Sequence, residues 1–170
     1  DIGIDYKIGI GEAAFYGPKL DIQIKNVHGK EDTLITIQID QMLAEKFGME
    51  YVDADGTKKN PYIIHRTSMG CYERTLALLI EKYAGAFPMW LAPLQVEVIP
   101  VSPEFTGYAQ EVTDKLSAAG IKAHCDARND TMRYKIREAQ LQKTPYMLVV
   151  GERDMNNGTV SVRTRSGDDK

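Results

Sequence analysis

A histidine, a cysteine and an arginine lie close together in the segment His65-Arg66-Thr67-Ser68-Met69-Gly70-Cys71-Tyr72-Glu73-Arg74. The pattern predicts a strand that carries His65, a turn of small residues, and a helix whose first turn presents Cys71 and Arg74. Residues three apart on a helix share one face, so a thiol and a permanent cation are expected beside an imidazole. Imidazole can bind a metal ion, and a guanidinium can stabilise phosphate charge without titrating.

These residues also have structural explanations. A single histidine at a strand end is more often a hydrogen-bonded structural residue than a metal ligand, and a helical arginine is more often a solvated surface cation. Cys71 and Cys125 are the two cysteines and form no Cys-x-x-Cys motif. Neither a disulfide framework nor a self-contained zinc knuckle is therefore predicted. The sequence also has no P-loop motif and no Rossmann glycine motif opening a helix.

The elements before residue 90 are predicted to form antiparallel β-structure. Alternation over 19–26 and 33–40 predicts two strands, the second with its isoleucines facing inward and Gln38 on the opposite, polar face. The further expected elements are a short helix over 41–47, a hairpin turning at Asp55-Gly56, a strand over 62–66, and a helix over 68–84 that starts at an N-cap Ser68.

Pro88 and Pro93 interrupt regular structure, and strands then alternate with helices. This order predicts a mixed, mainly parallel sheet covered by helices. The fold class is thus α/β (α+β), with an antiparallel domain over 1–90 and a small mixed-sheet α/β domain over 91–170. The second domain's expected elements are strands over 95–101, 122–127, 146–150 and 159–164, and helices over 103–119 and 131–142.

Composition narrows the classes of partner. The 170 residues are 43% hydrophobic and carry a net charge of −3, which argues against a generally basic nucleic-acid coat. Segment 122–143 nevertheless holds six basic and three acidic side chains, a patch large enough for local phosphate contacts. No apolar run approaches the roughly 20 residues that cross a bilayer, so we expect a cytoplasmic protein without a membrane partner.

Longer stretches resemble the threonyl-tRNA synthetases, a family of class II aminoacyl-tRNA synthetases. The resemblance covers essentially the whole chain in the right order. It implies a ligase that activates threonine with ATP and Mg²⁺, transfers it to tRNA(Thr), binds one Zn²⁺ and forms a homodimer. The matching stretches are Gly11–Asp21 (GEAAFYGPKLD), Thr36–Asp40 (TIQID), Ile64–Arg66 (IHR), Gly70–Arg74 (GCYER), Gly85–Pro93 (GAFPMWLAP) and Arg137–Leu141 (REAQL).

The resemblance implies roles in the first domain, the C-terminal part of the catalytic core. His65 matches one of three zinc ligands; the other two lie upstream, so the zinc site in this chain is expected to be incomplete. The family's zinc holds the amino group and hydroxyl of threonine, and a Lewis acid distinguishes a hydroxyl where an apolar pocket cannot. The other implied roles are catalysis for Arg74, ATP binding for Arg74 and Lys19, and threonine binding for Tyr16, Gln38 and Cys71.

Two positions depart from the family pattern. Cys71 stands where the family usually has Ser, and Thr33 stands where it usually has Gln near the nucleotide. Neither change removes a charge or a metal ligand. Both leave the fine geometry of the threonine and adenine contacts open.

The second domain resembles the family's anticodon-binding domain, with its closing helix expected to be missing. Asn129, Arg137 and Arg163 match anticodon-contacting positions, and Asp154 lies near another that is usually Glu. Guanidinium groups can grip phosphates or the edges of unpaired bases. The structural alternatives are a solvated arginine stripe, and an Asn129 that caps the following helix.

Three hypotheses remain open at this stage, one of which is that residues 1–90 serve only as a folding or dimer interface. The chain is expected to be part of a threonine–tRNA ligase and to be inactive in adenylation by itself, because the second class II motif lies upstream. It is still expected to bind a tRNA anticodon. The alternative is a stand-alone synthetase-like module that binds tRNA or regulates without catalysis.

Overall fold

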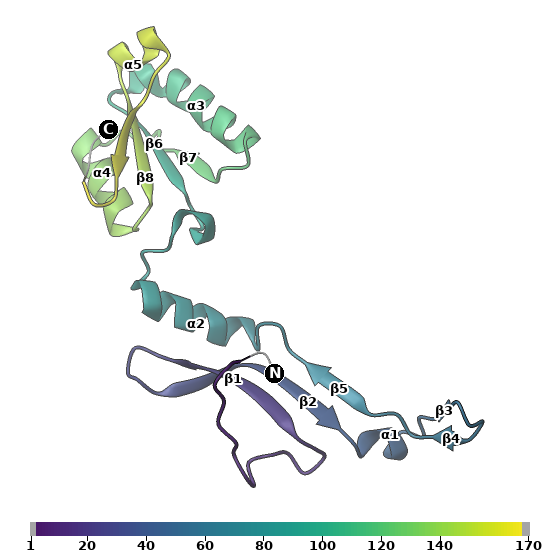
Figure 1. Cartoon of the computed structure of the whole chain (residues 1–170). Helices are drawn as coiled ribbons and strands as arrows, with labels where there is room; N and C mark the ends of the chain where they lie inside the picture. Colours follow the sequence, from purple (N-terminus) through teal and green to yellow (C-terminus); the bar gives the residue numbers. More distant parts are fainter. Residues whose placement is uncertain (1–2, 168–170) are drawn as a thin grey trace. The chain divides into compact units, whose positions relative to one another are not determined.

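The computed structural model describes residues 3–167 and divides the chain into two compact units, Asp1–Leu78 and Leu79–Lys170 (Figure 1). The point of division lies inside helix α2 (Tyr72–Tyr83). The sequence-based boundary between residues 90 and 91 stays a prediction.

The first unit contains an antiparallel sheet with the strand order β1-β2-β5. These strands are β1 (Lys19–Lys25), β2 (Glu31–Asp40) and β5 (Ile63–Arg66). Their register places Lys19, Gln38 and His65 in one row across the sheet. Residues paired directly across strands share a face, so the predicted alternation is confirmed as far as Ile22. The register shifts between Ile22 and Gln23, and Ile24 then pairs with Asp32 on the opposite face.

Smaller elements extend from this sheet. Helix α1 (Leu43–Lys46) follows β2, and β3 (Tyr51–Val52) pairs with β4 (Lys58–Lys59). The predicted hairpin turn is confirmed, since the Gly56 N–H donates to the Asp53 carbonyl over 2.9 Å.

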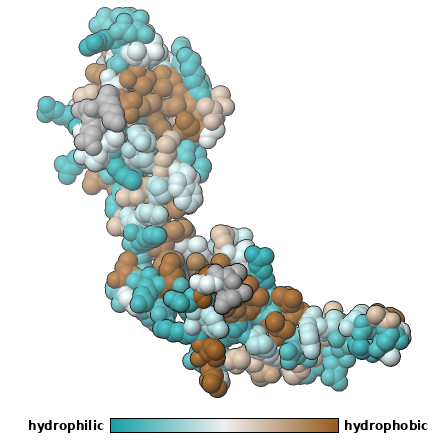
Figure 2. All heavy atoms as spheres, viewed as in Figure 1, coloured by the Kyte–Doolittle hydropathy of each residue, from teal (hydrophilic) through white to brown (hydrophobic). Residues whose placement is uncertain are grey.

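The prediction that the isoleucines of β2 face inward holds only in part, because Ile35 and Ile37 are half-buried and Ile39 is exposed. Ile39 is 39% exposed, and Leu20 and Ile64 on the neighbouring strands are 57% and 67% exposed. The opposite, polar face contains Asp40, which is fully buried. The apolar face is therefore covered only in part, and apolar side chains are visible on the surface of this unit in Figure 2. Within the described part of the first unit, Ala44 is the one buried apolar side chain.

Helix α2 begins later than predicted. Ser68 is not its N-cap; the cap is Cys71, whose Sγ accepts the Arg74 N–H over 3.3 Å. Gly70 makes this start possible, because its φ of +68° belongs to the left-handed region and a Cβ there would lie 2.5 Å from the Leu34 carbonyl oxygen. The tight turn before Cys71 therefore delays the helix.

The second unit has a four-stranded mixed sheet with the order β7-β6-β8-β9. Strands β6 (Val96–Pro100), β7 (Ala123–Cys125) and β8 (Tyr146–Val150) are parallel, and β9 (Ser161–Thr164) runs antiparallel to β8. This confirms the predicted sheet.

Helices surround this sheet. They are the single turns η1 (Met89–Leu91) and η2 (Pro103–Phe105), together with α3 (Thr106–Ala118), α4 (Met132–Leu141) and α5 (Glu152–Asn157). Helix α5 was not predicted, because six polar-rich residues between Gly151 and Gly158 resemble a loop in composition.

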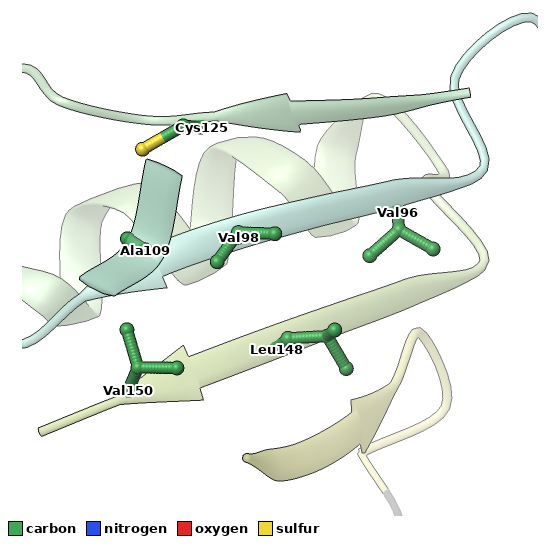
Figure 3. Packing of buried hydrophobic residues seen from close by; sticks show 6 residues of the cluster. All are labelled: Val96, Val98, Ala109, Cys125, Leu148 and Val150. Atoms are coloured by element: carbon green, nitrogen blue, oxygen red, sulfur yellow. The ribbon is translucent and has the colours of Figure 1, made fainter. Parts of the chain in front are cut away.

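Both faces of the second sheet are covered by apolar side chains. One cluster joins the strands to α3 and contains Val96, Val98, Ala109, Cys125, Leu148 and Val150 (Figure 3). The other joins them to α4 and contains Ile99, Ile136, Ala139 and Met147. Arg163 on β9 pairs with Met147, so Arg163 lies on the α4 side of the sheet.

Candidate functional site

Tyr16, Gln38 and His65 come together on the polar face of the first sheet. The Tyr16 hydroxyl donates to Gln38 Oε1 over 2.8 Å. The rings of Tyr16 and His65 meet edge to face with centroids 6.1 Å apart. A phenol, an amide and an imidazole therefore line one surface although they are far apart in the sequence.

The turn that carries Tyr16 is held against β2 by its backbone. The Gln41 N–H donates to the Tyr16 carbonyl over 2.9 Å, and the Ile39 N–H donates to the Pro18 carbonyl over 3.0 Å. Gly17 lies so close to β2 that a Cβ would come within 2.0 Å of the Ile39 oxygen. A residue without a side chain is thus required beside Tyr16.

Asp40 holds His65 in place. Its Oδ2 lies 3.0 Å from His65 Nε2, and its Oδ1 accepts the N–H groups of Met42 and Leu43, both over 2.9 Å. Burial alone would raise the pKa of Asp40, but the hydrogen bonds from the two N–H groups and His65 outweigh it and leave the pKa below its ordinary value. Asp40 is therefore a charged, fully satisfied carboxylate behind the imidazole.

This arrangement suits a histidine that binds a metal ion. Metal-binding histidines usually present their second ring nitrogen to a carboxylate, and Asp40 occupies Nε2 of His65, which leaves Nδ1 for a ligand. The described residues contain no group of three or more His, Cys, Asp or Glu side chains placed to hold a metal. His65 thus fits as one ligand of a site completed by other groups.

Lys19 lies in the same row, paired across the strands with Gln38. Its Nζ is 2.7 Å from Asp21 Oδ2, and this hydrogen bond and charge raise the pKa of Lys19. Asp21 also accepts the Thr36 hydroxyl over 2.8 Å. The cation is therefore directed along the polar face.

Arg74 contacts β2 at its other end. Its Nη1 donates to the Thr33 carbonyl oxygen over 3.2 Å, so the bond does not depend on the side chain at position 33. Cys71 is exposed beside it at the start of α2. Thr33 and Gln38 are about 17 Å apart along an extended strand, so the predicted residues form two groups on β2.

The predicted residues of the second unit lie on or near α4. Asn129 and Arg137 are exposed, and Arg163 is half-buried on the α4 side of the sheet. Asn129 does not cap the helix: Thr131 does, because its Oγ1 accepts the Tyr134 N–H over 3.3 Å. The structural alternative for Asn129 is therefore wrong.

Asp154 has a structural role. Its carboxylate accepts the Gly151 N–H over 3.1 Å and the Ser161 hydroxyl over 3.2 Å. It closes the first turn of α5 and joins that helix to β9.

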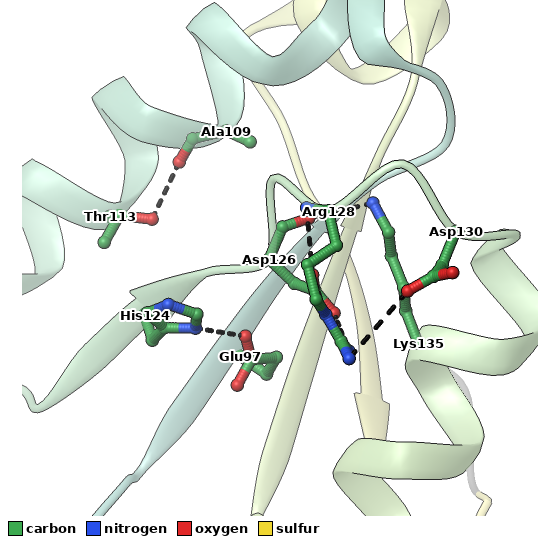
Figure 4. A network of polar contacts seen from close by, with 8 residues as sticks. All are labelled: Glu97, Ala109, Thr113, His124, Asp126, Arg128, Asp130 and Lys135. Atoms are coloured by element: carbon green, nitrogen blue, oxygen red, sulfur yellow. Dashed lines mark hydrogen bonds and ion pairs between the residues drawn. The ribbon is translucent and has the colours of Figure 1, made fainter.

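A buried polar network shapes the loop between β7 and α4, and sequence reasoning missed it (Figure 4). Asp126 accepts two hydrogen bonds from the Arg128 guanidinium, over 2.9 Å and 2.7 Å. Lys135, which is 4% exposed, donates its Nζ to the Asp126 carbonyl over 2.9 Å. The signal was the Asp-x-Arg pair directly after a strand.

A second carboxylate lies next to this network. Glu97 Oε1 is 2.6 Å from Nδ1 of the exposed His124 (Figure 4). Burial raises the pKa of Glu97, whereas the hydrogen bonds from Arg128 lower the pKa of Asp126. The two neighbouring acids are thus shifted in opposite directions.

Comparison with known proteins agrees with this division of sites. Residues 3–83 match the "tRNA synthetase class II core domain (G, H, P, S and T)" and residues 95–170 match the "Anticodon binding domain". A threonine–tRNA ligase of Clostridium perfringens is 62% identical over 164 residues, which are 96% of this chain and 26% of the relative. The chain is homologous to the threonyl-tRNA synthetases. A ligase of Streptococcus thermophilus is 54% identical over 96% of the chain and 25% of its own length.

A solved structure supports the same assignment of fold. The RNA binding domain of threonyl-tRNA synthetase from Cryptosporidium parvum matches with a TM-score of 0.87 and 35% identity, covering 99% of this chain and 43% of that one. This chain spans about a quarter of the length of the ligases that it matches. No helix in residues 3–167 has the length and apolar character needed to cross a membrane.

Gly70→Ala should destabilise the first unit more than Gly29→Ala does. Both glycines have positive φ, +68° and +77°, but only Gly70 approaches a carbonyl oxygen, while nothing lies within 4 Å of a Cβ at Gly29. The control, Gly29→Ala, should lower the free energy of unfolding by about 1 kcal/mol. Gly70→Ala should lower it by about 1–3 kcal/mol more. Urea unfolding measures the difference, and equal costs would contradict the close approach of this turn to β2.

Asp126→Asn and Glu97→Gln should change stability with opposite pH dependence. A lowered pKa means that Asp126 stabilises the fold above its ordinary pKa of 3.8 and loses this contribution as pH falls through the folded value. Asp126→Asn should therefore cost about 2 kcal/mol at pH 7, and less at pH 3.

A raised pKa means the reverse for Glu97, whose contribution is complete below its ordinary pKa of 4.5 and lost as pH rises through the folded value. Glu97→Gln should thus be more stable relative to the parent at pH 7 than at pH 4. Denaturant unfolding at these pH values measures both variants. Parallel pH profiles for the two substitutions would show that the opposite shifts are wrong.

Proposed function

We propose that this chain is part of a threonine–tRNA ligase, in which residues 1–90 contribute to threonine activation and residues 91–170 bind the anticodon of tRNA(Thr). One observation carries the proposal. Gln38 and His65 are paired across neighbouring strands, and the Tyr16 side chain contacts both of them. This arrangement unites, on one polar face, the residues that match threonine and zinc contacts in the homologous ligases.

In this proposal the polar face divides into an amino-acid end and a nucleotide end. Tyr16 and Gln38 contact threonine, and so does Cys71, which lies at the start of α2 beside Arg74. His65, oriented by Asp40, is one ligand of a Zn²⁺ ion. When bound, the zinc supplies a Lewis acid for the amino group and hydroxyl of threonine, a basis for rejecting valine that an apolar pocket lacks.

The nucleotide end is marked by Arg74, which is held on the Thr33 carbonyl and stabilises the phosphate charge that develops when threonine attacks ATP with its Mg²⁺. Lys19, which is paired with Gln38 at the amino-acid end, supplies a second positive charge for ATP. A guanidinium suits this role because it stays charged at every physiological pH.

The ligase requires more than these residues. The exposed apolar side chains Leu20, Ile39 and Ile64 of the first sheet support further parts of a catalytic core packing there, as does the greater length of the ligases. We place the complete enzyme in the cytoplasm as a homodimer. The chain by itself is proposed to bind RNA without activating threonine.

The second unit supports RNA binding through local charge. Its basic segment 122–143 includes Arg137 on the exposed face of α4. Unpaired anticodon bases expose the edges that guanidinium groups recognise. The contacts with phosphate should make binding weaker as salt is added.

The chain should bind a hairpin with the anticodon loop of tRNA(Thr), and Arg137→Ala should weaken binding about tenfold. Lys115→Ala is the matched control, since it also removes one exposed charge but lies on α3, across the sheet. Titration of a fluorescently labelled hairpin at several salt concentrations measures both. If both variants lost the same affinity for the hairpin, a specific contact by Arg137 would be contradicted.

The chain alone should give no threonine-dependent exchange of pyrophosphate into ATP. In the complete ligase, Arg74→Ala should lower this exchange at least a hundredfold, because phosphate stabilisation is lost. A stand-alone RNA-binding module would show no exchange even in its longest natural form, which separates the two functions. Turnover by residues 1–170 alone would contradict the proposed division of the core.

A further inference from the structure

We infer that Tyr134 and Arg128 together form a stacking platform for an unpaired base of the bound RNA. This inference rests on the proposed RNA-binding function and deepens it. It assigns a base-binding surface beside Asn129 and Arg137, made by two residues to which the function proposed above gives no individual role.

Tyr134 is an aromatic residue that the core does not use. Helix α4 buries Ile136 and Ala139 against the sheet, whereas Tyr134 is 47% exposed. Its own N–H donates to the cap Thr131, so the ring projects from a fixed point in the first turn. An exposed ring on a rigid turn offers a flat apolar surface at low conformational cost.

Arg128 lies next to this ring and is itself fixed. Its guanidinium carbon is 6.0 Å from the centroid of the Tyr134 ring, within the range of a cation–π contact. Asp126, which is 3% exposed, holds the guanidinium through two hydrogen bonds. Asp130 Oδ2 lies 3.8 Å from Arg128 Nη1. Little side-chain freedom is therefore lost when a base stacks on the pair.

The position of the pair indicates the kind of ligand. Tyr134 and Arg137 are three residues apart on α4 and share its exposed face, so the ring lies beside a cation that can contact phosphate. Aromatic rings and arginine planes next to such cations bind the faces of unpaired bases. Paired bases of a duplex hide these faces, so the ligand is a single-stranded loop.

Stacking on a base and recognition of a base edge make binding affinity depend differently on the RNA sequence. Every base has a face, so the contribution of Tyr134 should be similar for any base in the stacked position. A contact to base edges should instead change when the anticodon changes. The two contributions can therefore be separated with variant RNA.

The test uses the full chain and hairpins with the anticodon loop of tRNA(Thr), each with 2-aminopurine at one loop position. Tyr134→Ala should weaken binding about tenfold, and by the same factor for a hairpin with an altered anticodon. Tyr134→Phe keeps the ring and should bind like the parent. One 2-aminopurine position should become brighter in the Tyr134→Ala complex, because stacking quenches its fluorescence.

Leu141→Ala is the matched control, since Leu141 is an exposed apolar residue on the same helix and should change affinity less than twofold. The inference is overturned if Tyr134→Ala binds the hairpin as tightly as the parent. It is also overturned if Tyr134→Phe or Leu141→Ala loses as much affinity for the hairpin as Tyr134→Ala does. These results leave the proposed function intact, whereas failure of the unaltered chain to bind any hairpin overturns both.

Discussion

The candidate threonine site depends on one buried charge. Asp40 is fully buried and joins the end of β2, the start of α1 and His65 on β5 through three hydrogen bonds. Gln38 lies two residues before it on the same face, and Tyr16 is bonded to Gln38. In a unit with almost no buried apolar side chains, this carboxylate does the positioning that a hydrophobic core does elsewhere.

In the second unit, different residues hold the fold together and position the site. Apolar clusters on both faces of its sheet hold the strands and helices together. Its buried polar residues are then available to shape one loop, where Asp126 and Lys135 fix the chain between β7 and α4. The residues proposed to contact RNA are thus placed by a domain with a core on both faces of its sheet, and the residues proposed for threonine activation by a sheet with few buried apolar side chains.

The sequence predicted strands and faces better than burial. Alternation showed which residues of β2 share a face, but not how much of that face is covered, so Ile39 was expected to face inward and is exposed. The start of α2 was missed because Ser68 is the better capping residue locally, whereas the approach of Gly70 to Leu34 is a tertiary contact. Asp40 and His65 are 25 residues apart, and only the strand register brings them together. The roles of Arg74 and Arg137 came from resemblance, since their residue types alone fit a solvated surface.

Two glycines fix both halves of the candidate site against the same strand, β2. Gly17 approaches the Ile39 oxygen and Gly70 approaches the Leu34 oxygen, so the number of β2 residues between these oxygens sets the distance between the turn that carries Tyr16 and the start of the helix that carries Arg74. A one-residue insertion or deletion in that interval would change this distance and would also turn the side chains on one side of it to the other face of the sheet. The number of residues in this interval is consequently a constraint on the dimensions of the proposed substrate site.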